Sequence, residues 1–163
     1  MPTVNVKNVK GGEKLQQKLR ELAAIKAQTK VGFLDRATYP DGTSVAYVAY
    51  LNEYGGRHSA RPFMKHTFKR NLKKWVRGIA ANIKRTGASK AGIAKAYKMA
   101  GMVAVGDVKK TIKDWPAGGN APATVKAKAR RGRSNKKLAA INPQTVLIDT
   151  GRMISAVSYE VKI

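Results

Sequence analysis

Two long stretches of helical periodicity, separated by a four-residue break, constrain the fold of this chain more than any other feature. Residues 63–85 place six apolar side chains within about 100° of one another on a helical wheel. A second helix is predicted over residues 90–114, where apolar residues recur at spacings of three and four. The break at residues 86–89 lets the two helices pack as a hairpin. The apolar residues expected to be buried on the first helix are Phe68, Leu72, Trp75, Val76, Ile79 and Ile83.

Shorter elements are predicted on both sides of this hairpin. An amphipathic helix is expected over residues 13–26, and another that begins at Thr43 or Ser44 and ends at Gly55. Pro62 suits the first position of the long helix, because its missing N–H has no helical partner there. Alternation of apolar and polar residues predicts strands at residues 4–6, 30–34, 146–148 and 156–163.

These elements predict an α+β fold in a single domain, residues 1–163. We expect a small antiparallel sheet, built from N-terminal, central and C-terminal strands, to pack against several helices that include the long hairpin. A length of 163 residues and an apolar content of 43% are ordinary for one domain with its own core.

The charge of the chain is unusual. It contains 33 Lys and Arg residues against 9 Asp and Glu, a net charge of +24, and no acidic residue lies between Glu53 and Asp107. A surplus of this kind favours a polyanion or an acidic protein surface as a partner. A solvated helix face is the simpler alternative. The residues predicted to face a polyanion are Arg70, Lys73, Lys74, Arg77, Lys84 and Arg85.

Residues 116–145 are rich in Gly, Pro, Ala and basic residues and contain no acid. Such a segment buries too little apolar area to repay its ordering entropy, so a flexible, basic, extended arm is expected, with a short helix at residues 122–129 on contact with a partner. The cations expected to bind that partner are Lys126, Lys128, Arg130, Arg131, Arg133, Lys136 and Lys137.

The segment VLIDTG, residues 146–151, matches the catalytic strand and turn of a retroviral-type aspartic protease. That mechanism needs two carboxylates that share a proton, and a wide loop downstream of the aspartate. Twelve residues follow Gly151, enough for one turn and one strand, so we expect no protease. Asp149 is expected instead to cap a one-turn helix between two strands.

Three segments, taken in order, resemble the tail-completion and neck proteins of long-tailed bacteriophages. They are VAYVAYLNEYGGRHSARPFM, NAPATVKAKARRG and VLIDTGRMISAVSYEV, with the basic helical pair between the first two. In that family a helix ending in N-E-[FY]-G leads into an A-R-P-F turn, and Leu-Ile-Asp-Thr-Gly precedes the last strand. The matching residues here are Asn52, Glu53, Tyr54, Gly55, Ala60, Arg61, Pro62, Phe63, Leu147, Ile148, Asp149, Thr150 and Gly151.

The resemblance implies a structural protein of the virion neck or tail, assembled in the host cytoplasm. It implies a homo-oligomeric ring, expected to be six-fold, that completes the tail or joins it to the head and lets genomic DNA pass during ejection. The implied neighbours are head-completion and tail-terminator or tail-tube proteins. The assembly interface is expected to include Arg57, Arg61, Pro62 and Phe63 together with the cations of the arm.

Two other classes of function remain open. A free nucleic-acid-binding protein would use the basic helix face and the arm on phosphates. An enzyme is not expected, because no nucleophile, base and metal set converges in the sequence. His58 and His66 lack a matching carboxylate cluster and the chain has no cysteine, so no metal site or cofactor is expected. No apolar run suits a membrane span or a secretory leader, so no membrane association is expected.

Overall fold

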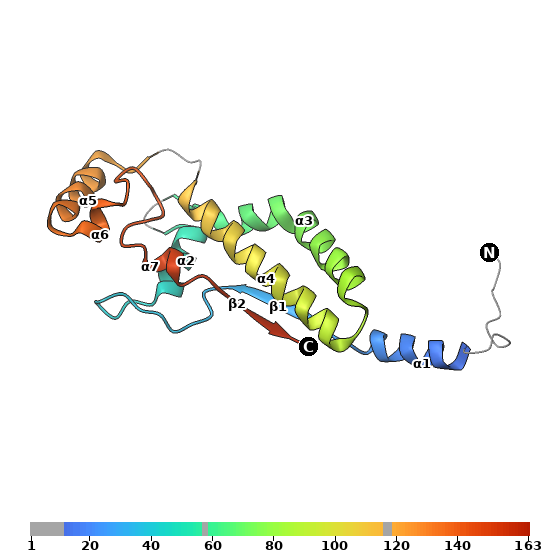
Figure 1. Ribbon diagram of the computed structural model, residues 1–163. Coiled ribbons are helices and arrows are strands. Elements are labelled where there is room, and N and C mark those ends of the chain that lie inside the picture. Colours follow the sequence, from blue (N-terminus) through green and yellow to red (C-terminus); the bar gives the residue numbers. More distant parts are fainter. Residues whose placement is uncertain (1–11, 57–58, 116–118) are drawn as a thin grey trace.

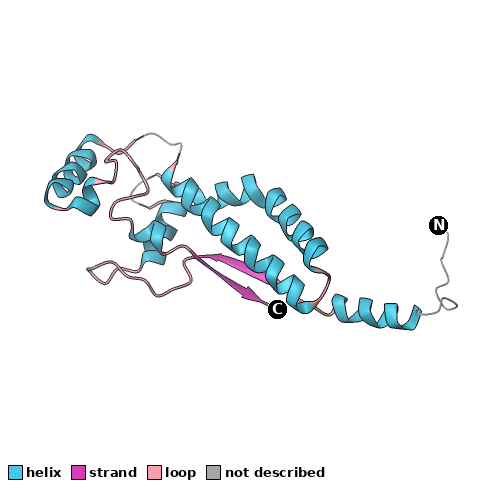
Figure 2. Ribbon diagram, in the orientation of Figure 1, coloured by secondary structure: helices cyan, strands magenta, loops and turns pink. Residues whose placement is uncertain are grey.

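The computed structural model describes residues 12–56, 59–115 and 119–163. Within these residues, seven helices and two strands form an α+β fold (Figures 1 and 2). The predicted fold class is therefore confirmed, and the small antiparallel sheet has two strands in the described residues.

The long helical pair is confirmed. Helix α3 (Phe63–Thr86) and helix α4 (Lys90–Lys113) lie side by side in Figure 1. Gly87 takes a φ of +85° in the break, a conformation that few side chains tolerate. Ser89 then caps α4, since its Oγ accepts a hydrogen bond of 3.1 Å from the backbone N–H of Gly92. Pro62 occupies the N-cap of α3, one residue before the predicted position.

Strands β1 (Gln28–Gly32) and β2 (Ser158–Lys162) pair antiparallel, with Val31 opposite Tyr159. The sheet packs on α4, and Gly101 permits the close approach. A Cβ atom at Gly101 would lie 2.4 Å from Cδ2 of Tyr159, too near for any side chain. The predicted strand at residues 4–6 lies outside the described residues.

The predicted strand at residues 146–148 is wrong. These residues form no strand, and the side chain of Leu147 inserts into the core with 5% of its surface exposed. The carbonyls of Thr145 and Ile148 accept hydrogen bonds from the ammonium group of Lys128 instead of from a neighbouring strand. The side chain of Lys128 therefore bonds to carbonyl groups that would accept backbone N–H groups in a sheet.

Two shorter helices precede the hairpin. Helix α1 (Gly12–Ala23) projects away from the rest of the molecule in Figure 1. Helix α2 (Val45–Tyr54) is capped by Ser44 and ends at Gly55, which has a φ of +89°. Both ends of α2 lie where the sequence predicts them.

The core forms where α2, α4 and the C-terminal segment meet the start of α3. Phe63, at the first position of α3, has no exposed surface and packs edge-on against Phe33, with ring centroids 6.2 Å apart. The buried residues around it are Val45, Ala49, Val108, Ile112, Leu147, Met153 and Val157.

The prediction of an extended arm is wrong for residues 119–145, the part of this segment that the structure describes. Residues 119–145 contain helix α5 (Pro122–Ser134) and helix α6 (Lys136–Ala139), and helix α7 (Arg152–Ser155) follows. Pro122 lies at the start of α5, where its missing N–H is harmless. The Ala, Lys and Arg residues that follow have high helix propensity, and this preference outweighs the like-charge repulsion that favoured an extended arm.

Candidate functional site

The junction between α2 and α3 carries the first segment of the family resemblance. The carboxylate of Glu53 accepts a hydrogen bond of 2.8 Å from the backbone N–H of Met64 and one of 2.9 Å from that of Lys65. These two N–H groups lie in the first turn of α3 and have no helical acceptor. The side chain of Glu53 therefore caps the first turn of α3 from the preceding helix, α2. The sequence did not predict this role.

Arg61 belongs to the same junction. Its backbone N–H donates to the carbonyl of Asn52 at 2.6 Å, and its guanidinium Nη1 donates to Asn52 Oδ1 at 3.3 Å. Partial burial lowers the pKa of Arg61. Of the other residues predicted here as an interface, Pro62 is half-buried and Phe63 lies in the core, whereas Arg57 lies outside the described residues. Phe63 is therefore not a surface residue of this chain, because its ring anchors α3.

A cavity of about 420 Å³, lined by both polar and apolar side chains, opens between α2, α5 and the segment before α7. Lys128 borders it with only 9% of its surface exposed, and its Nζ donates to the carbonyls of Thr145 at 2.7 Å and Ile148 at 2.6 Å. Burial lowers the pKa of Lys128, while the nearby Asp149 acts in the opposite direction. Lys128 thus fastens α5 to the body of the protein and is not available to a partner.

Asp149, the aspartate of the DTG segment, lies at the edge of the same cavity. Its carboxylate forms two hydrogen bonds with the guanidinium of Arg131, at 2.9 and 2.7 Å. The predicted N-cap role of Asp149 is wrong, because Gly151 occupies the N-cap of α7 with a φ of +79°. The side chain that accepts an N–H in the first turn of α7 belongs to Thr150, whose Oγ1 lies 3.4 Å from the backbone nitrogen of Arg152. The carboxylate of Asp149 therefore accepts its hydrogen bonds from the guanidinium of Arg131 on α5 and not from the backbone N–H groups at the start of α7.

Six of the seven predicted arm cations remain exposed, and five of these lie outside the Arg131–Asp149 pair. None of the five forms an ion pair within the parts of the chain that the structure describes. They cover the surface of α5 and α6 at the end of the molecule farthest from α1 (Figure 1). We call this set the α5 basic surface: Lys126, Arg130, Arg133, Lys136 and Lys137.

The six cations predicted on the first long helix are all exposed along α3, and we call them the α3 basic face: Arg70, Lys73, Lys74, Arg77, Lys84 and Arg85. Only Lys74 among them has an acidic partner in the described residues, Asp107 on α4 at 2.9 Å. The same carboxylate accepts a hydrogen bond of 2.7 Å from the indole N–H of Trp75. Asp107 therefore ties α3 to α4.

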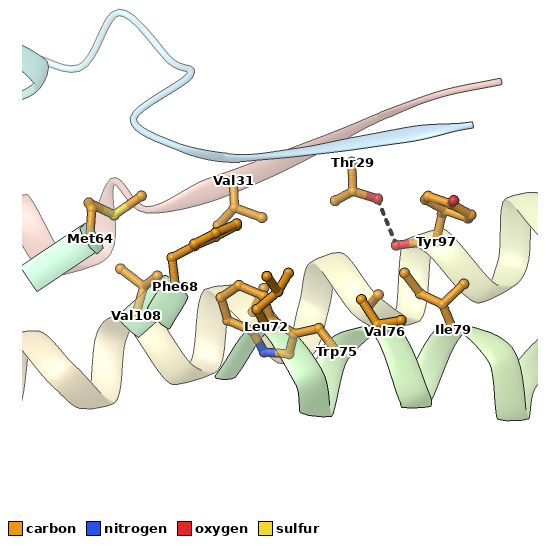
Figure 3. Close-up of a pocket in the computed structure, with 12 residues that line it drawn as sticks. Thr29, Val31, Met64, Phe68, Leu72, Trp75, Val76, Ile79, Tyr97 and Val108 are labelled. Atoms are coloured by element: carbon orange, nitrogen blue, oxygen red, sulfur yellow. Dashed lines mark hydrogen bonds between the residues drawn. The ribbon is translucent and has the colours of Figure 1, made fainter. Parts of the chain in front are cut away.

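The apolar face of α3 is the largest departure from expectation. It was predicted to be buried, but Phe68, Leu72 and Val76 are 54%, 40% and 56% exposed. Their side chains line a groove of about 310 Å³ between α3, α4 and β1 (Figure 3). The two-stranded sheet reaches only part of this face, which explains the exposure. We call it the α3 groove.

The two histidines of the chain were considered as metal ligands in the sequence, and the structure describes one of them. No cluster of three or more His, Asp or Glu side chains there is arranged to hold a metal ion. His66 packs edge-on against Trp115, with ring centroids 5.7 Å apart, and His58 lies outside the described residues. None of the described helices has the length and apolar character needed to cross a bilayer.

Comparison of the chain with models of protein families, with curated proteins and with solved structures finds no match.

Proposed function

We propose that this chain is a structural protein of a phage neck or tail, which forms an oligomeric ring that completes the tail or joins it to the head and allows DNA to pass. Its neighbours in the virion would be head-completion and tail-terminator or tail-tube proteins. No catalytic step belongs to this proposal.

The observation that supports the proposal most is the amount of uncovered apolar surface. Leu19 on α1, Tyr54 on α2 and Phe68 on α3 are each more than half exposed, and they lie on three different elements. A contiguous apolar patch, such as the one that Phe68 forms with Leu72 and Val76 along the α3 groove, is typical of interfaces between subunits. The order of the three resembling segments points to the same class of protein.

A free nucleic-acid-binding protein remains the second candidate. The specific observation in its favour is that five of the six cations on the α3 basic face lack an acidic partner in the described residues. Phosphates would supply the missing countercharge.

The mass of the purified protein at about 1 M salt separates the two candidates. Charge interactions are screened within about 3 Å under that condition, so a ring held by apolar contacts persists while DNA is released. We expect a closed oligomer by native mass spectrometry and by negative-stain imaging. A monomer that binds DNA only at low salt would support the second candidate instead.

Charge reversal on the α5 basic surface tests the virion role itself. Replacement of Lys126, Arg130, Arg133 and Lys137 by Glu should block the joining of tails to heads and leave the melting temperature nearly unchanged, because these side chains are exposed. The matched control reverses four exposed lysines of α4, Lys90, Lys95, Lys98 and Lys113. Normal yields of infectious particles from the first variant would exclude α5 from the joining interface.

A further inference from the structure

Helix α1 has an apolar stripe that the described chain covers only in part, at Leu22. Leu15 and Leu19 are 55% and 57% exposed, and Leu22 follows them on the same side of the helix. A helix of 12 residues is only marginally stable by itself in water. The stripe therefore requires a partner surface to hold α1 in its helical form.

The α3 groove is a surface of the corresponding kind. Phe68, Leu72, Val76 and Ile79 point from α3 into the space beside β1, and Tyr97 of α4 closes one end (Figure 3). Residues 68–79 of α3 and the 12 residues of α1 each extend over about 18 Å, at 1.5 Å per residue. The apolar side chains of α3 recur at spacings of three and four, which suits the packing of a helix alongside.

Charge also favours α1 as the occupant. Glu13 and Glu21 offset all but one of its three cations, Lys14, Lys18 and Arg20, so α1 has a net charge of +1. Helix α3 carries eight Lys and Arg residues and no acid. A nearly neutral helix can lie against α3 with less repulsion than the strongly basic α5.

The chain around the end of α1 directs this helix away from its own groove. The N–H groups of Ala24 and Ile25 still bond to carbonyls of α1, at 3.1 and 3.2 Å. Only Lys26 and Ala27 then remain before β1 begins at Gln28. Two residues are at the short limit for a connection between packed elements, and α1 continues outward in Figure 1.

We propose that α1 of one copy occupies the α3 groove of the next copy, with Leu15, Leu19 and Leu22 against Phe68, Leu72 and Val76. The contact joins two different surfaces, so repetition closes into a ring when the rotation between copies permits. This inference builds on the proposed ring and specifies one of its contacts. Each copy donates one helix and receives another.

Cysteine pairing tests the proposal directly, because the chain has no cysteine of its own. Leu19→Cys and Val76→Cys are made in separate chains, mixed, and oxidised mildly. We expect a disulfide-linked pair of the two different chains. Gln17→Cys, on the opposite side of α1, is the matched control and should not pair with Val76→Cys.

A chain with both Leu19→Cys and Val76→Cys distinguishes exchange from folding back. Exchange gives a ladder of linked chains under non-reducing conditions, whereas a link within single chains would overturn the inference. Absence of any link, while native mass spectrometry still shows the ring, would also overturn it and leave the proposed ring intact. A monomer at every concentration would overturn both.

A second variant does not depend on disulfide chemistry. Leu19→Asp places a charge in the contact and should weaken association by tenfold or more, whereas Gln17→Asp adds the same charge on the outer side and should change it less than about twofold. Equal effects of the two variants would contradict the exchange of α1. Circular dichroism of the dilute protein checks that both variants fold.

Discussion

Arg131 on α5 and Asp149 of the DTG segment form a bidentate ion pair, with Nη2 of Arg131 2.7 Å from Oδ1 of Asp149. This pair gives the aspartate a structural partner. Both side chains are nearly half exposed, so solvent screens their attraction.

The first prediction concerns Asp149. Asp149→Asn should lower the free energy of unfolding by less than about 1 kcal/mol, because exposed pairs contribute little. Arg131→Gln should have the same effect, and the double variant should add almost nothing, since either change breaks the pair. Urea denaturation measures all three. Pepstatin-sensitive cleavage of peptides that disappears in Asp149→Asn would restore the protease interpretation.

The second prediction compares two phenylalanines of α3. Phe63 is fully buried, so Phe63→Ala should reduce the free energy of unfolding by about 3–5 kcal/mol. Phe68→Ala removes the same atoms from the exposed groove and should cost the isolated chain less than about 1 kcal/mol. Chemical denaturation of dilute protein gives both values. Similar losses would mean that the groove is covered within one chain.

The third prediction concerns the cap of α3. Glu53→Ala leaves the N–H groups of Met64 and Lys65 without their carboxylate and should destabilise the protein by about 1–2 kcal/mol. The control is Glu21→Ala, which removes a carboxylate from an exposed pair with Lys18 on α1. We expect a change near zero for the control. A Glu53 variant as stable as the control would show that water replaces the cap without loss.

Interactions within a few residues could be read from the sequence, and those between distant segments could not. The cap at Ser44, the stop at Gly55 and the break at residues 86–89 depend on neighbours in the chain, and the structure contains all three. The partners of Asp149 and Glu53 lie 18 and 11 or 12 residues away. No local pattern identifies such partners.

The segment around α5 is helical because long-range contacts offset the repulsion between its cations. Seven cations without a nearby acid suggested an extended chain, yet Lys128 gains two carbonyl acceptors and Arg131 gains Asp149. These long-range contacts bury Lys128 and give the exposed Arg131 a countercharge. The remaining five face solvent, where repulsion is screened.

The apolar face of α3 illustrates a different limit. Periodicity identifies a side of a helix that avoids water, but it does not say whether the same chain or another one covers that side. Phe68 and Val76 were correctly placed on one face and remain exposed in the isolated chain.

The fourth prediction concerns pH and Lys128. Burial lowers its pKa in the folded protein below the ordinary value of 10.5, so the unfolded chain binds more protons between the two pKa values. The contribution of Lys128 to the free energy of unfolding therefore rises with pH through that window, and it is least favourable below the folded-state pKa. The stability of the wild type relative to Lys128→Met should increase as pH approaches 10.5. The exposed Lys126→Met is the control and should show no such slope.

The neutral-pH comparison of the same variants tests the contacts of Lys128. Lys128→Met leaves the carbonyls of Thr145 and Ile148 without their donor and should lower the free energy of unfolding by about 1–3 kcal/mol. A Lys128→Met protein as stable as Lys126→Met would indicate that α5 does not depend on this anchor.

The last prediction concerns DNA and the α3 basic face. If α1 of a neighbouring copy covers the apolar side of α3, the basic side points away from that contact and remains open to phosphates. Each cation that neutralises a phosphate contributes about 0.9 to the slope of log K against log salt concentration. Replacement of Arg70, Lys73 and Arg77 by Gln should therefore reduce the slope by up to about 2.7.

The matched control for that variant is Lys74→Gln. Lys74 already has Asp107 as its countercharge at 2.9 Å, so it releases few counterions on binding and its loss should change the slope by less than about 0.9. Fluorescence anisotropy of labelled DNA at several salt concentrations gives the slopes. If the triple variant changes the slope no more than Lys74→Gln does, the phosphates bind elsewhere, and the open cations of α3 serve an acidic protein neighbour or only solubility.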